Sequence, residues 1–223
     1  MQKYIGFIFG PNGSGKGTLA KKLAEEHGYT YISNGRVIRD WAEANNRKDL
    51  LDMIDDGEFI DDKTVSHILE EKFKTISHNQ KLLIEGVPRK ASQVSFIVEL
   101  SKKYNFKPLW VIVLHAPLEV LIDRVKDRVF APDGHVYHMT LNPPPKKYKL
   151  SELHTRLDDR PEIVRKRFEY YINHTLECVS DEYFLNSQIK TIDATKPISD
   201  VFEEGRHFIK EVEKLMHDSA FSS

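Results

Sequence analysis

A glycine-rich loop near the N-terminus constrains the fold of this chain more than any other stretch. Gly10 and Gly15 are separated by four residues and followed by Lys16, which is the spacing of a phosphate-binding loop. Glycines let backbone N–H groups approach phosphate oxygens because no Cβ blocks the approach. A helix that begins at Gly15 adds the positive end of its dipole, and the Lys16 ammonium adds a full charge. The motif therefore predicts a strand, this loop and a helix in direct succession.

The flanking sequence supplies both elements. Tyr4–Phe9 has the apolar character of a buried strand, and Thr18–Glu26 carries apolar residues at helical spacing. This order argues against the alternative of a glycine-rich turn with a chance lysine. Gly17 stands where a serine or threonine commonly follows the lysine, so the metal-binding hydroxyl is absent or displaced to Thr18. We therefore expect Mg²⁺ to be held mostly through water.

Composition narrows the class of protein. The 223 residues are 40% hydrophobic and 30% charged with a net charge of −1, which predicts one soluble α/β domain with insertions. The near-neutral balance argues against nucleic-acid or membrane-surface binding. The single cysteine, Cys178, excludes an intrachain disulfide and a multi-cysteine zinc site. With no expected signal peptide or membrane span, we expect a cytoplasmic monomer.

Apolar runs alternate with helical patterns along the chain. We expect strands at Tyr4–Phe9, Tyr29–Ile32, Lys81–Glu85, Leu109–His115 and Ile189–Asp193. We expect the later helices at Asp62–Ser77, Lys90–Tyr104, Leu118–Arg128, Glu162–Cys178 and Ile198–His217. This alternation predicts a P-loop α/β fold with a doubly wound, five-stranded parallel sheet and helices on both faces. Phosphate chemistry would then lie at the carboxyl ends of the strands.

Two segments interrupt the alternation. Residues 33–60 are helical and polar, and residues 129–159 are irregular and rich in Pro, Gly, His and Tyr. An irregular stretch of that length in a compact domain is usually functional or disordered. We interpret the second segment as a folded lid that closes over a nucleotide. The core is then made of residues 1–32, 61–128 and 160–223, with 33–60 and 129–159 as insertions.

Six arginines follow strands or flank helices where they would face one cleft. Phosphoryl transfer needs positive groups around the moving phosphoryl and exclusion of water, and arginine grips two oxygens at once. Each one alone could be a solvated surface charge, so the prediction depends on their joint placement with the loop. They are Arg39, Arg89, Arg124, Arg128, Arg156 and Arg167.

Several motifs in order resemble those of the adenylate kinases, a family of nucleoside monophosphate kinases, in their long-lid form. The resemblance covers nearly the whole chain. It is carried by Gly10–Thr18, Ile32–Gly35 with Arg39, Glu85–Arg89, Ala131–His138 with Asn142–Pro144, Arg156–Asp159 with Val164–Arg167, and Asp193–Pro197.

The resemblance implies a role for each matching residue. The catalytic set would be Lys16, Arg39, Arg89, Arg128, Arg156 and Arg167. ATP would be bound by Gly10, Pro11, Asn12, Gly13, Ser14, Gly15, Lys16, Gly17, Thr18, Arg124, Arg128, Val136, Tyr137 and Lys196. AMP would be bound by Asn34, Gly35, Arg39, Glu58, Phe59, Ile60, Gly86, Val87, Pro88, Arg89, Gln93, Arg156 and Arg167. Glu85 would hold Mg²⁺ through water.

Some of these residues keep a structural alternative. Gln93, expected to read adenine through its amide, could be an exposed polar residue of a helix. Asp158 and Asp159, expected to pair with arginines, could cap the following helix. His138 could ligate a metal, but a hydrogen-bonded structural role is favoured, and we expect a lid without zinc.

Departures from the family pattern leave the acceptor less certain than the reaction. Asn34, Arg36 and Val87 replace the usual threonine, aspartate and phenylalanine near the acceptor pocket, and Glu85 replaces an aspartate. The first interpretation is reversible transfer of a phosphoryl group from ATP with Mg²⁺ to AMP, so that both nucleotides become ADP. The second is the same chemistry with another donor, such as GTP, or another monophosphate. The third is a nucleotide-binding protein without activity.

Overall fold

A five-stranded parallel sheet forms the centre of the molecule. The structure is a computed structural model that describes residues 3–77, 80–133, 135–140 and 142–220. The strand order is β2-β3-β1-β4-β7, and every neighbouring pair is parallel. The strands are β1 (Lys3–Phe9), β2 (Tyr29–Ser33), β3 (Lys81–Glu85), β4 (Phe106–His115) and β7 (Gln188–Asp193). The predicted sheet is confirmed, and β4 begins three residues earlier than expected.

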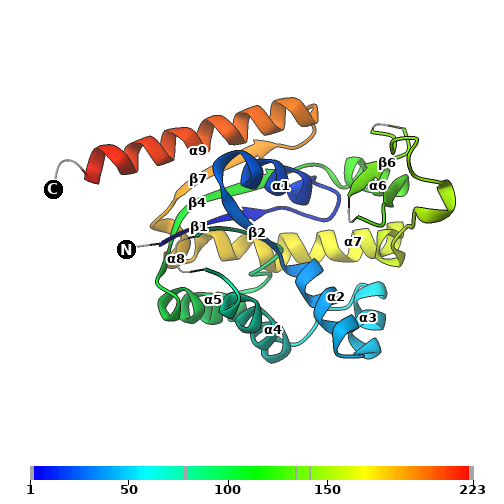
Figure 1. The fold of residues 1–223 in the computed structure, drawn as a ribbon, viewed down its shortest axis with the longest axis horizontal. Helices are drawn as coiled ribbons and strands as arrows, with labels where there is room; N and C mark the ends of the chain where they lie inside the picture. Colours follow the sequence, from blue (N-terminus) through cyan, green and yellow to red (C-terminus); the bar gives the residue numbers. More distant parts are fainter. Residues whose placement is uncertain (1–2, 78–79, 134, 141, 221–223) are drawn as a thin grey trace.

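Alternate residues of the strands feed two separate cores, one on each face of the sheet. On one face Phe7, Val111 and Ile84 pack against α4 (Asp62–Lys74) and α5 (Ala91–Lys103). On the other, Ile8 and Ile112 pack against α1 (Lys16–His27), α6 (Leu118–Lys126), α7 (Pro161–Tyr170) and α9 (Ile198–Ala220). Figure 1 shows α1 and α9 above the sheet and α4 and α5 below it. This is the expected doubly wound arrangement.

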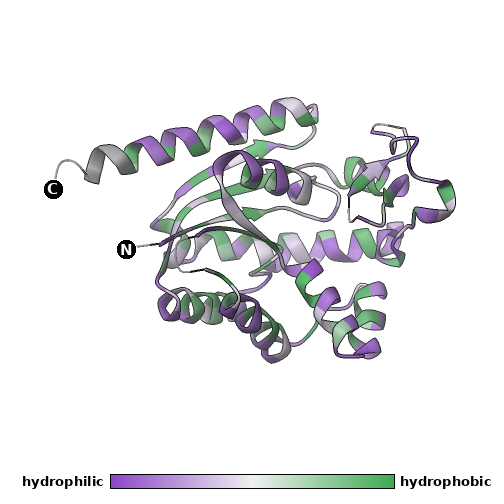
Figure 2. Ribbon diagram, in the orientation of Figure 1, coloured by the Kyte–Doolittle hydropathy of each residue, from purple (hydrophilic) through white to green (hydrophobic). Residues whose placement is uncertain are grey.

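The hydropathy pattern agrees with these layers. The inner strands are apolar on both faces, as expected for strands covered by helices on each side. In Figure 2, α9 carries green and purple residues in alternation along its length, which is the pattern of a helix with one buried side. No helix in the described part of the chain is both long and apolar enough to cross a bilayer.

The strand order reverses beside β1. β2 and β3 lie on one side of β1, and β4 and β7 lie on the other. In an open parallel sheet, ligands bind at the carboxyl ends of the strands at this point of reversal. The glycine-rich loop follows β1 directly, so the topology places it in that crevice.

Apart from Ser33, the last residue of β2, both insertions lie outside the main sheet. Residues 33–60 hold α2 (Asn34–Ala44) and α3 (Lys48–Asp55). Residues 129–159 hold most of a small antiparallel hairpin, β5 (Arg128–Phe130) with β6 (Val136–His138), and the 3₁₀ turns Leu150–Glu152 and Leu157–Asp159. We did not predict this hairpin, because strands of three residues are too short to show a period. Figure 1 shows the two insertions at the same end of the molecule.

Helix ends differ from the predictions in several places, and α9 ends three residues after the predicted His217. α6 ends at Lys126, so Arg128 begins β5 instead of ending a helix. α4 ends at Lys74, three residues before the predicted end at Ser77. The predicted helix Glu162–Cys178 is α7 followed by a π-helical turn, Tyr171–Thr175, and a 3₁₀ turn, Leu176–Ser180. The short helix α8 (Glu182–Leu185) then leads into β7.

Candidate active site

The glycine-rich loop has the backbone shape that its sequence predicts. β1 ends at Phe9, and α1 begins at Lys16. Gly13 and Gly15 have φ angles of 83° and 84°, in the left-handed region that favours glycine. A Cβ on Gly13 would also lie 2.8 Å from the carbonyl oxygen of Leu121 on α6. The loop therefore needs glycine at this position for both conformation and space.

Two buried side-chain atoms of the loop have no hydrogen-bond partner among the described residues. The Asn12 Nδ2 and Ser14 Oγ atoms are buried and, among the described residues, make no hydrogen bond. Buried polar groups are usually satisfied, so such atoms in a concave loop point to a ligand. Lys16 Nζ donates to the Pro11 carbonyl oxygen at 3.2 Å. In the described part of the chain no carboxylate lies within ion-pair distance of Lys16.

Burial lowers the pKa of Lys16 to about 8, and the nearby charge of Glu85 opposes this shift only in part. Arg89, Arg128 and Arg167 lower the pKa further because like charges disfavour the ammonium. The lysine thus sits in a desolvated site with an excess of positive charge. Such a site is suited to a polyanion.

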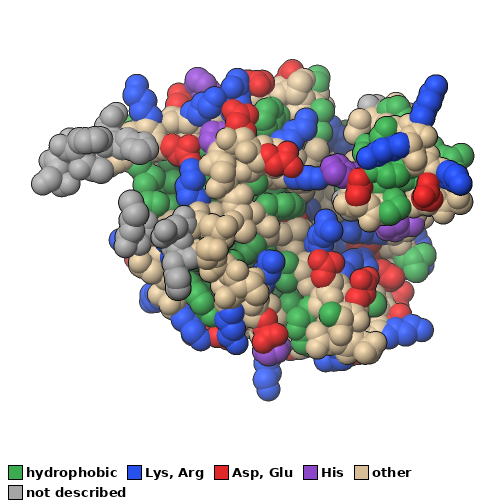
Figure 3. All heavy atoms as spheres, in the orientation of Figure 1, with side chains coloured by type: hydrophobic (Ala, Val, Ile, Leu, Met, Phe, Trp, Pro, Cys, Tyr) green, Lys and Arg blue, Asp and Glu red, His purple; other side chains and the backbone are tan. Residues whose placement is uncertain are grey.

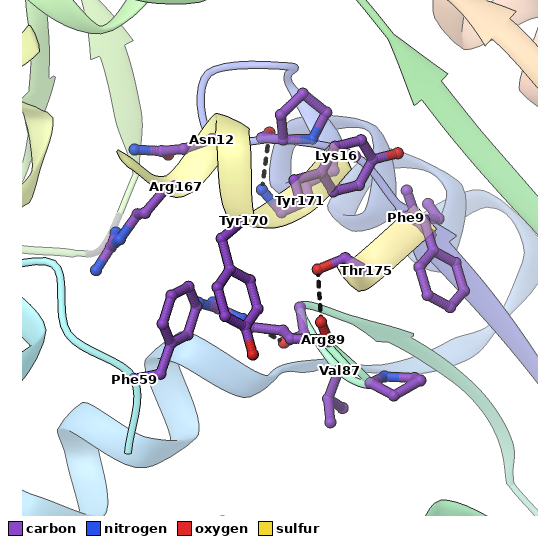
Figure 4. A pocket seen from close by; sticks show the side chains of 15 residues that line it. Phe9, Asn12, Lys16, Phe59, Val87, Arg89, Arg167, Tyr170, Tyr171 and Thr175 are labelled. Carbon is purple, nitrogen blue, oxygen red and sulfur yellow. Dashed lines mark hydrogen bonds between the residues drawn. The ribbon is translucent and has the colours of Figure 1, made fainter. Parts of the chain in front are cut away.

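The loop faces an open cleft whose empty volume, with adjoining solvent included, is about 540 Å³. Gly86–Arg89, which follows β3, also lines the cleft, as do Tyr171 and Thr175 of the π-helical turn Tyr171–Thr175. Figure 3 shows a hollow between the 129–159 segment and the α2–α3 pair, with Lys and Arg side chains at its floor. Figure 4 shows Lys16, Arg89 and Arg167 coming to this cleft from three different elements.

Arg89 is fixed at the mouth of the cleft by backbone contacts. Its Nε donates to the Gly86 carbonyl oxygen at 2.9 Å, and its own carbonyl oxygen accepts from Thr175 Oγ1 at 2.7 Å. Burial, together with the charge of Arg167, lowers the pKa of Arg89 to about 10. No ion pair reaches Arg89 from the residues that the structure describes, so its charge is free to meet an anion.

Two buried aspartates gather three of the other arginines. Asp158 pairs with Arg167 and lies 3.3 Å from Arg39, measured from Arg39 Nη2 to Asp158 Oδ1. Asp159 pairs with Arg128 through both carboxylate oxygens. Burial alone would raise the pKa of Asp158, but Arg167 and Arg39 outweigh it and hold that pKa below its ordinary value. The helix-cap alternative is wrong, because neither aspartate caps α7.

The remaining contacts of these arginines position them further. Arg39 Nη1 donates to Asp55 Oδ1 at 2.9 Å, and Arg167 Nη2 donates to the Ile54 carbonyl oxygen at 2.9 Å. Arg128 Nη2 donates to Asn12 Oδ1 at 3.3 Å, which ties the lid entry to the glycine-rich loop. Asp158 and Asp159 thus act with Asp55 as carboxylate partners of the cationic groups.

Arg156 is held by a ring rather than by an ion pair. Its Cζ lies 4.0 Å from the centre of the Phe130 ring. Burial and the neighbouring charge of Arg39 lower the pKa of Arg156. Arg124 is half-buried on α6, and burial lowers its pKa as well.

Glu85 is the last residue of β3 and directly precedes Gly86, which lines the cleft. It is 7% exposed and accepts hydrogen bonds from Ser33 Oγ and Tyr31 OH, both into Oε1. Ser33 is the register partner of Glu85 on the neighbouring strand β2. Within the described residues no hydrogen bond reaches the second carboxylate oxygen, Oε2.

Gln93 is buried, so the alternative of an exposed helix residue is wrong. Its Nε2 donates to Asp62 Oδ1 at 2.9 Å, and its Oε1 accepts from the Arg89 backbone N–H at 2.8 Å. Both the nitrogen and the oxygen of the Gln93 side-chain amide are thus hydrogen-bonded within the protein. Asn34 Nδ2 donates to the Gly86 carbonyl oxygen at 3.2 Å, while Asn34 Oδ1 is buried and has no partner among the described residues.

Several residues that the resemblance assigns lie away from the cleft lining. Glu58 and Val136 are exposed, and Lys196 is exposed with its Nζ 3.0 Å from Glu204 on α9. Tyr137 is half-buried in β6. The cleft lining brings together Gly10, Pro11, Asn12, Lys16, Phe59, Gly86, Val87, Pro88, Arg89 and Arg167 from the predicted set.

Sequence reasoning missed other residues of the cleft. Tyr170, Tyr171 and Thr175 line it, and Tyr31 reaches Glu85. Their only sequence signal is position: Tyr170 follows Arg167 by three residues and so lies near it on one helix face. The π-helical turn that aims Thr175 at Arg89 has no signature in the sequence.

The lid histidines make polar contacts within the protein. His138 Nδ1 lies 3.0 Å from Thr140 Oγ1, and His135 Nε2 lies 2.8 Å from Lys21 Nζ on α1. His135 Nδ1 also lies 3.1 Å from Asp133 Oδ1. Among the described residues, no group of three or more His, Cys, Asp or Glu side chains is placed to hold a metal ion.

Comparison with known proteins gives consistent matches. The family model described as Adenylate kinase matches residues 8–188. The chain is 32% identical over 210 residues to an adenylate kinase of Methanosarcina barkeri, which covers 91% of this chain and 97% of the relative. It is 34% identical over 206 residues to an adenylate kinase of Chloroherpeton thalassium, covering 88% and 94%. An adenylate kinase of Fusobacterium nucleatum is 32% identical over 201 residues, with 88% and 94% covered.

Proposed function

The chain belongs to the adenylate kinase family, and we propose that it transfers the terminal phosphoryl group of ATP reversibly to AMP, giving ADP from both nucleotides. Membership of this family makes the protein a phosphotransferase. The observation that carries the proposal is the pair of cations across the cleft, Lys16 and Arg89, which are desolvated and lack carboxylate partners in the described part of the chain.

The two cations divide the substrates between them. Lys16 lies in the loop whose buried donors Asn12 Nδ2 and Ser14 Oγ have no hydrogen-bond acceptor among the described residues. We assign this side of the cleft to the phosphates of ATP, whose oxygens would accept from these donors. Arg89 lies across the cleft beside the Gly86–Pro88 wall, and we assign it to the AMP phosphate. Two phosphate groups that meet between these charges would be aligned for in-line transfer, which is the main demand of this chemistry.

Four further arginines complete the proposed catalytic set, three of them held by aspartates and Arg156 held by the Phe130 ring. Arg128, Arg156 and Arg167 would surround the moving phosphoryl, and Arg39 would bind AMP from α2. Asp158 and Asp159 keep Arg39, Arg128 and Arg167 oriented and neutralised before the nucleotides arrive. A phosphoryl group can then compete for guanidinium groups that are already in place, so little reorganisation is needed in the transition state.

The chain also offers a group that suits hydrated Mg²⁺, the ion that this family uses with ATP. A carboxylate oxygen is the hard ligand that Mg²⁺ prefers, and it commonly acts through water. Glu85 is held by Ser33 and Tyr31 through one oxygen, which leaves the other for a water ligand. The residues fit the ion, and Glu85 is the one that would hold it. Bound with ATP, Mg²⁺ neutralises phosphate charge.

AMP is the acceptor that we propose over other monophosphates. Gln93 carries the donor and acceptor pair that matches the edge of adenine, and it already lies beside Arg89. The Asp62 and Arg89 contacts fix the amide so that its two ends cannot exchange. We propose ATP as the donor because the family uses it. Lys196, which the resemblance places near the donor base, pairs with Glu204 in this structure.

A panel of nucleotide pairs tests this proposal. Purified protein with Mg²⁺ is given ATP or GTP as donor and AMP, GMP, CMP or UMP as acceptor, and nucleoside diphosphates are quantified by chromatography. We expect ATP with AMP to be the fastest pair. Equal rates for another acceptor would contradict the AMP assignment, with Asn34 and Val87 as the first residues to vary. No diphosphate from any pair would contradict the catalytic proposal itself.

We further propose that the enzyme acts as a monomer in a reducing cytosol. The single cysteine, Cys178, is buried, which argues against a disulfide between two chains. Burial raises the pKa of its thiol to about 11, so it is inert toward oxidants at neutral pH. Light scattering during gel filtration should give the mass of one chain, with and without reductant.

A further inference from the structure

An aromatic pair joins the 33–60 segment to the core at the edge of the cleft. The rings of Phe59 and Tyr170 are stacked, with centroids 3.8 Å apart and planes inclined by 27°. This is the shortest ring separation among the described residues. Phe59 lies in the loop between α3 and α4, and Tyr170 is the last residue of α7. Figure 4 shows both rings facing each other inside the cleft.

The stack is the end of a longer contact between this loop and α7. Gly57 has a φ of 74°, and a Cβ there would lie 2.5 Å from Cγ2 of Ile163 on α7. One turn further along the helix, Arg167 Nη2 donates to the Ile54 carbonyl oxygen at 2.9 Å. The backbone therefore lies directly on the helix before Phe59 reaches Tyr170.

Phe59 also contacts the arginine that we assign to AMP. The Cζ atom of Arg89 lies 5.6 Å from the centre of the Phe59 ring, within cation–π range. Among the described residues, the Arg89 guanidinium makes a hydrogen bond to the Gly86 carbonyl oxygen and a cation–π contact with this ring, and it forms no ion pair. Tyr170 thus supports Phe59 on one side, and Phe59 supports Arg89 beside it.

We propose that Tyr170 is a positioning residue of the acceptor site. It holds Phe59 and the loop on α7, and through Phe59 it sets the guanidinium of Arg89 for the phosphate of a nucleoside monophosphate. This rests on the proposed function, and neither the loop motifs nor the arginine pattern assigns it. Because the stack touches neither Lys16 nor the glycine-rich loop, it should act on the acceptor and leave the donor alone.

Steady-state kinetics with a matched set of variants tests the proposal. Tyr170→Leu removes the ring, and Tyr170→Phe keeps it while losing only the hydroxyl. A stacked pair contributes about 0.5–1.5 kcal/mol, so Tyr170→Leu should raise the KM for AMP by roughly 2- to 10-fold. The KM for ATP and kcat at saturation should stay within about 2-fold, since ground-state positioning chiefly affects binding. Tyr170→Phe should match the unmodified protein.

A binding measurement without turnover separates this proposal from the proposed function. Calorimetric titration with AMP alone should show the same rise in Kd for Tyr170→Leu. Ile172→Ala, an exposed neighbour two residues away, is the control and should bind AMP normally. If the unmodified protein does not bind AMP, the proposed function fails. If it binds AMP and Tyr170→Leu binds equally well, only the role of Tyr170 is overturned.

A second variant covers the case in which Tyr170→Leu does not fold. Phe59→Leu breaks the stack from the other side and should give the same AMP-specific loss, and the double variant should lose no more than either single one. Additive losses would contradict a shared stack. A loss in Tyr170→Phe as large as that in Tyr170→Leu would also overturn the proposal, because the hydroxyl and not the ring would then matter.

Discussion

At the scale of single residues, the cations of the cleft fall into two groups. Arg39, Arg128 and Arg167 are held by aspartates, whereas Lys16 and Arg89 interact, among the described residues, with backbone carbonyl oxygens and, for Arg89, with an aromatic ring. Lys16 and Arg89 are desolvated and form no ion pair with the residues that the structure describes, and burial lowers both pKa values. A polyanion that enters the cleft would supply the negative charge that these two residues lack, so we propose Lys16 and Arg89 as the anchors of the site.

Lys16→Met should remove turnover while the protein stays folded. The substitution keeps most of the side-chain length but deletes the charge that counts most in the transition state. We expect kcat to fall at least about 100-fold, with an unchanged circular dichroism spectrum and melting temperature. Lys22→Met, an exposed lysine of the same helix, is the control. A Lys16→Met variant that keeps more than about a tenth of kcat would contradict the assignment.

The lowered pKa of Lys16 predicts that activity falls at basic pH, which gives the pH–rate profile a descending basic limb. Its value is about 8 in the free enzyme, so the ammonium is present below that pH and is lost as pH rises through it. The ratio kcat/KM for ATP should therefore fall above about pH 8, since this ratio reports the free enzyme. At saturating ATP the phosphates stabilise the ammonium, and kcat should fall only at higher pH.

The matched control for this pH profile is Lys16→Arg. A guanidinium does not lose its proton in this range, so whatever activity remains in Lys16→Arg should lack the basic limb. If kcat/KM fell at the same basic pH in both proteins, the titration would belong to a group other than Lys16.

At the scale of elements, the sequence predicts the sheet far better than the insertions. The inner strands β1, β3 and β4 are buried along most of their length, so each shows as a continuous apolar run. Lys81–Glu85 is predicted to the residue for this reason. The hairpin β5–β6 has three residues in each strand, and Val136 in it is 41% exposed, so neither period nor burial marks it.

The same contrast holds within the site. The glycine-rich loop is a local motif, and its conformation follows from its own glycines. The ring that supports Arg89 is not local, because Phe59 and Tyr170 are far apart in the sequence and meet only in the fold. The π-helical turn Tyr171–Thr175 depends on tertiary packing for the same reason, since its residues have ordinary helical character.

We propose that the two insertions move as covers over a fixed core. ATP in an open site would react with water, so closure is needed for transfer to AMP, and release of the products needs reopening. Arg39 lies in one insertion, and Arg128 and Arg156 flank the other, so each cover brings positive charge to the phosphates.

Fluorophores on Asn46→Cys and Asn142→Cys measure this movement directly. The natural Cys178 is buried, with its pKa raised to about 11, so the two introduced thiols react first. We expect the distance between the labels to shorten when a bisubstrate analogue, two adenosines joined through five phosphates, saturates the protein. An unchanged distance at saturation would show that the covers are static and that water is excluded by other means.

At the scale of the whole molecule, a polar cluster fastens the last helix to the sheet. Glu213 on α9 accepts from Tyr29 OH at 3.1 Å and from Lys81 Nζ at 2.7 Å, and lies 3.1 Å from His27 Nδ1. Trp110 Nε1 in turn donates to Tyr29 OH at 2.9 Å. One carboxylate thus joins α9 to α1, β2 and β3, at the amino ends of those strands and away from the phosphate loop.

Glu213→Gln should destabilise the fold by about 1–2 kcal/mol at neutral pH, since it weakens hydrogen bonds to a charged group. Burial alone would raise the pKa of Glu213, but the bonds from Lys81 and His27 hold it below its ordinary value. A depressed pKa stabilises the fold above the unfolded value of about 4.3 and loses that effect as pH falls through the folded value.

Urea unfolding of the two proteins as a function of pH checks this contribution. The difference between unmodified protein and Glu213→Gln should be largest near pH 7 and shrink below about pH 4.3. Glu99→Gln, an exposed carboxylate on α5, is the control and should change stability little at either pH. A difference that stays constant with pH would assign the Glu213 effect to packing instead of charge.

Transfer of a labelled phosphoryl group tests the central claim most directly. The protein with Mg²⁺ receives ATP labelled at its γ-phosphate, with and without AMP, and the products are separated and counted. We predict that the label appears at the β-position of newly formed ADP only when AMP is present, with little inorganic phosphate, and that Lys16→Met shows neither product. Label released as inorganic phosphate at the same rate without AMP, or no transfer to AMP at all, would contradict the account.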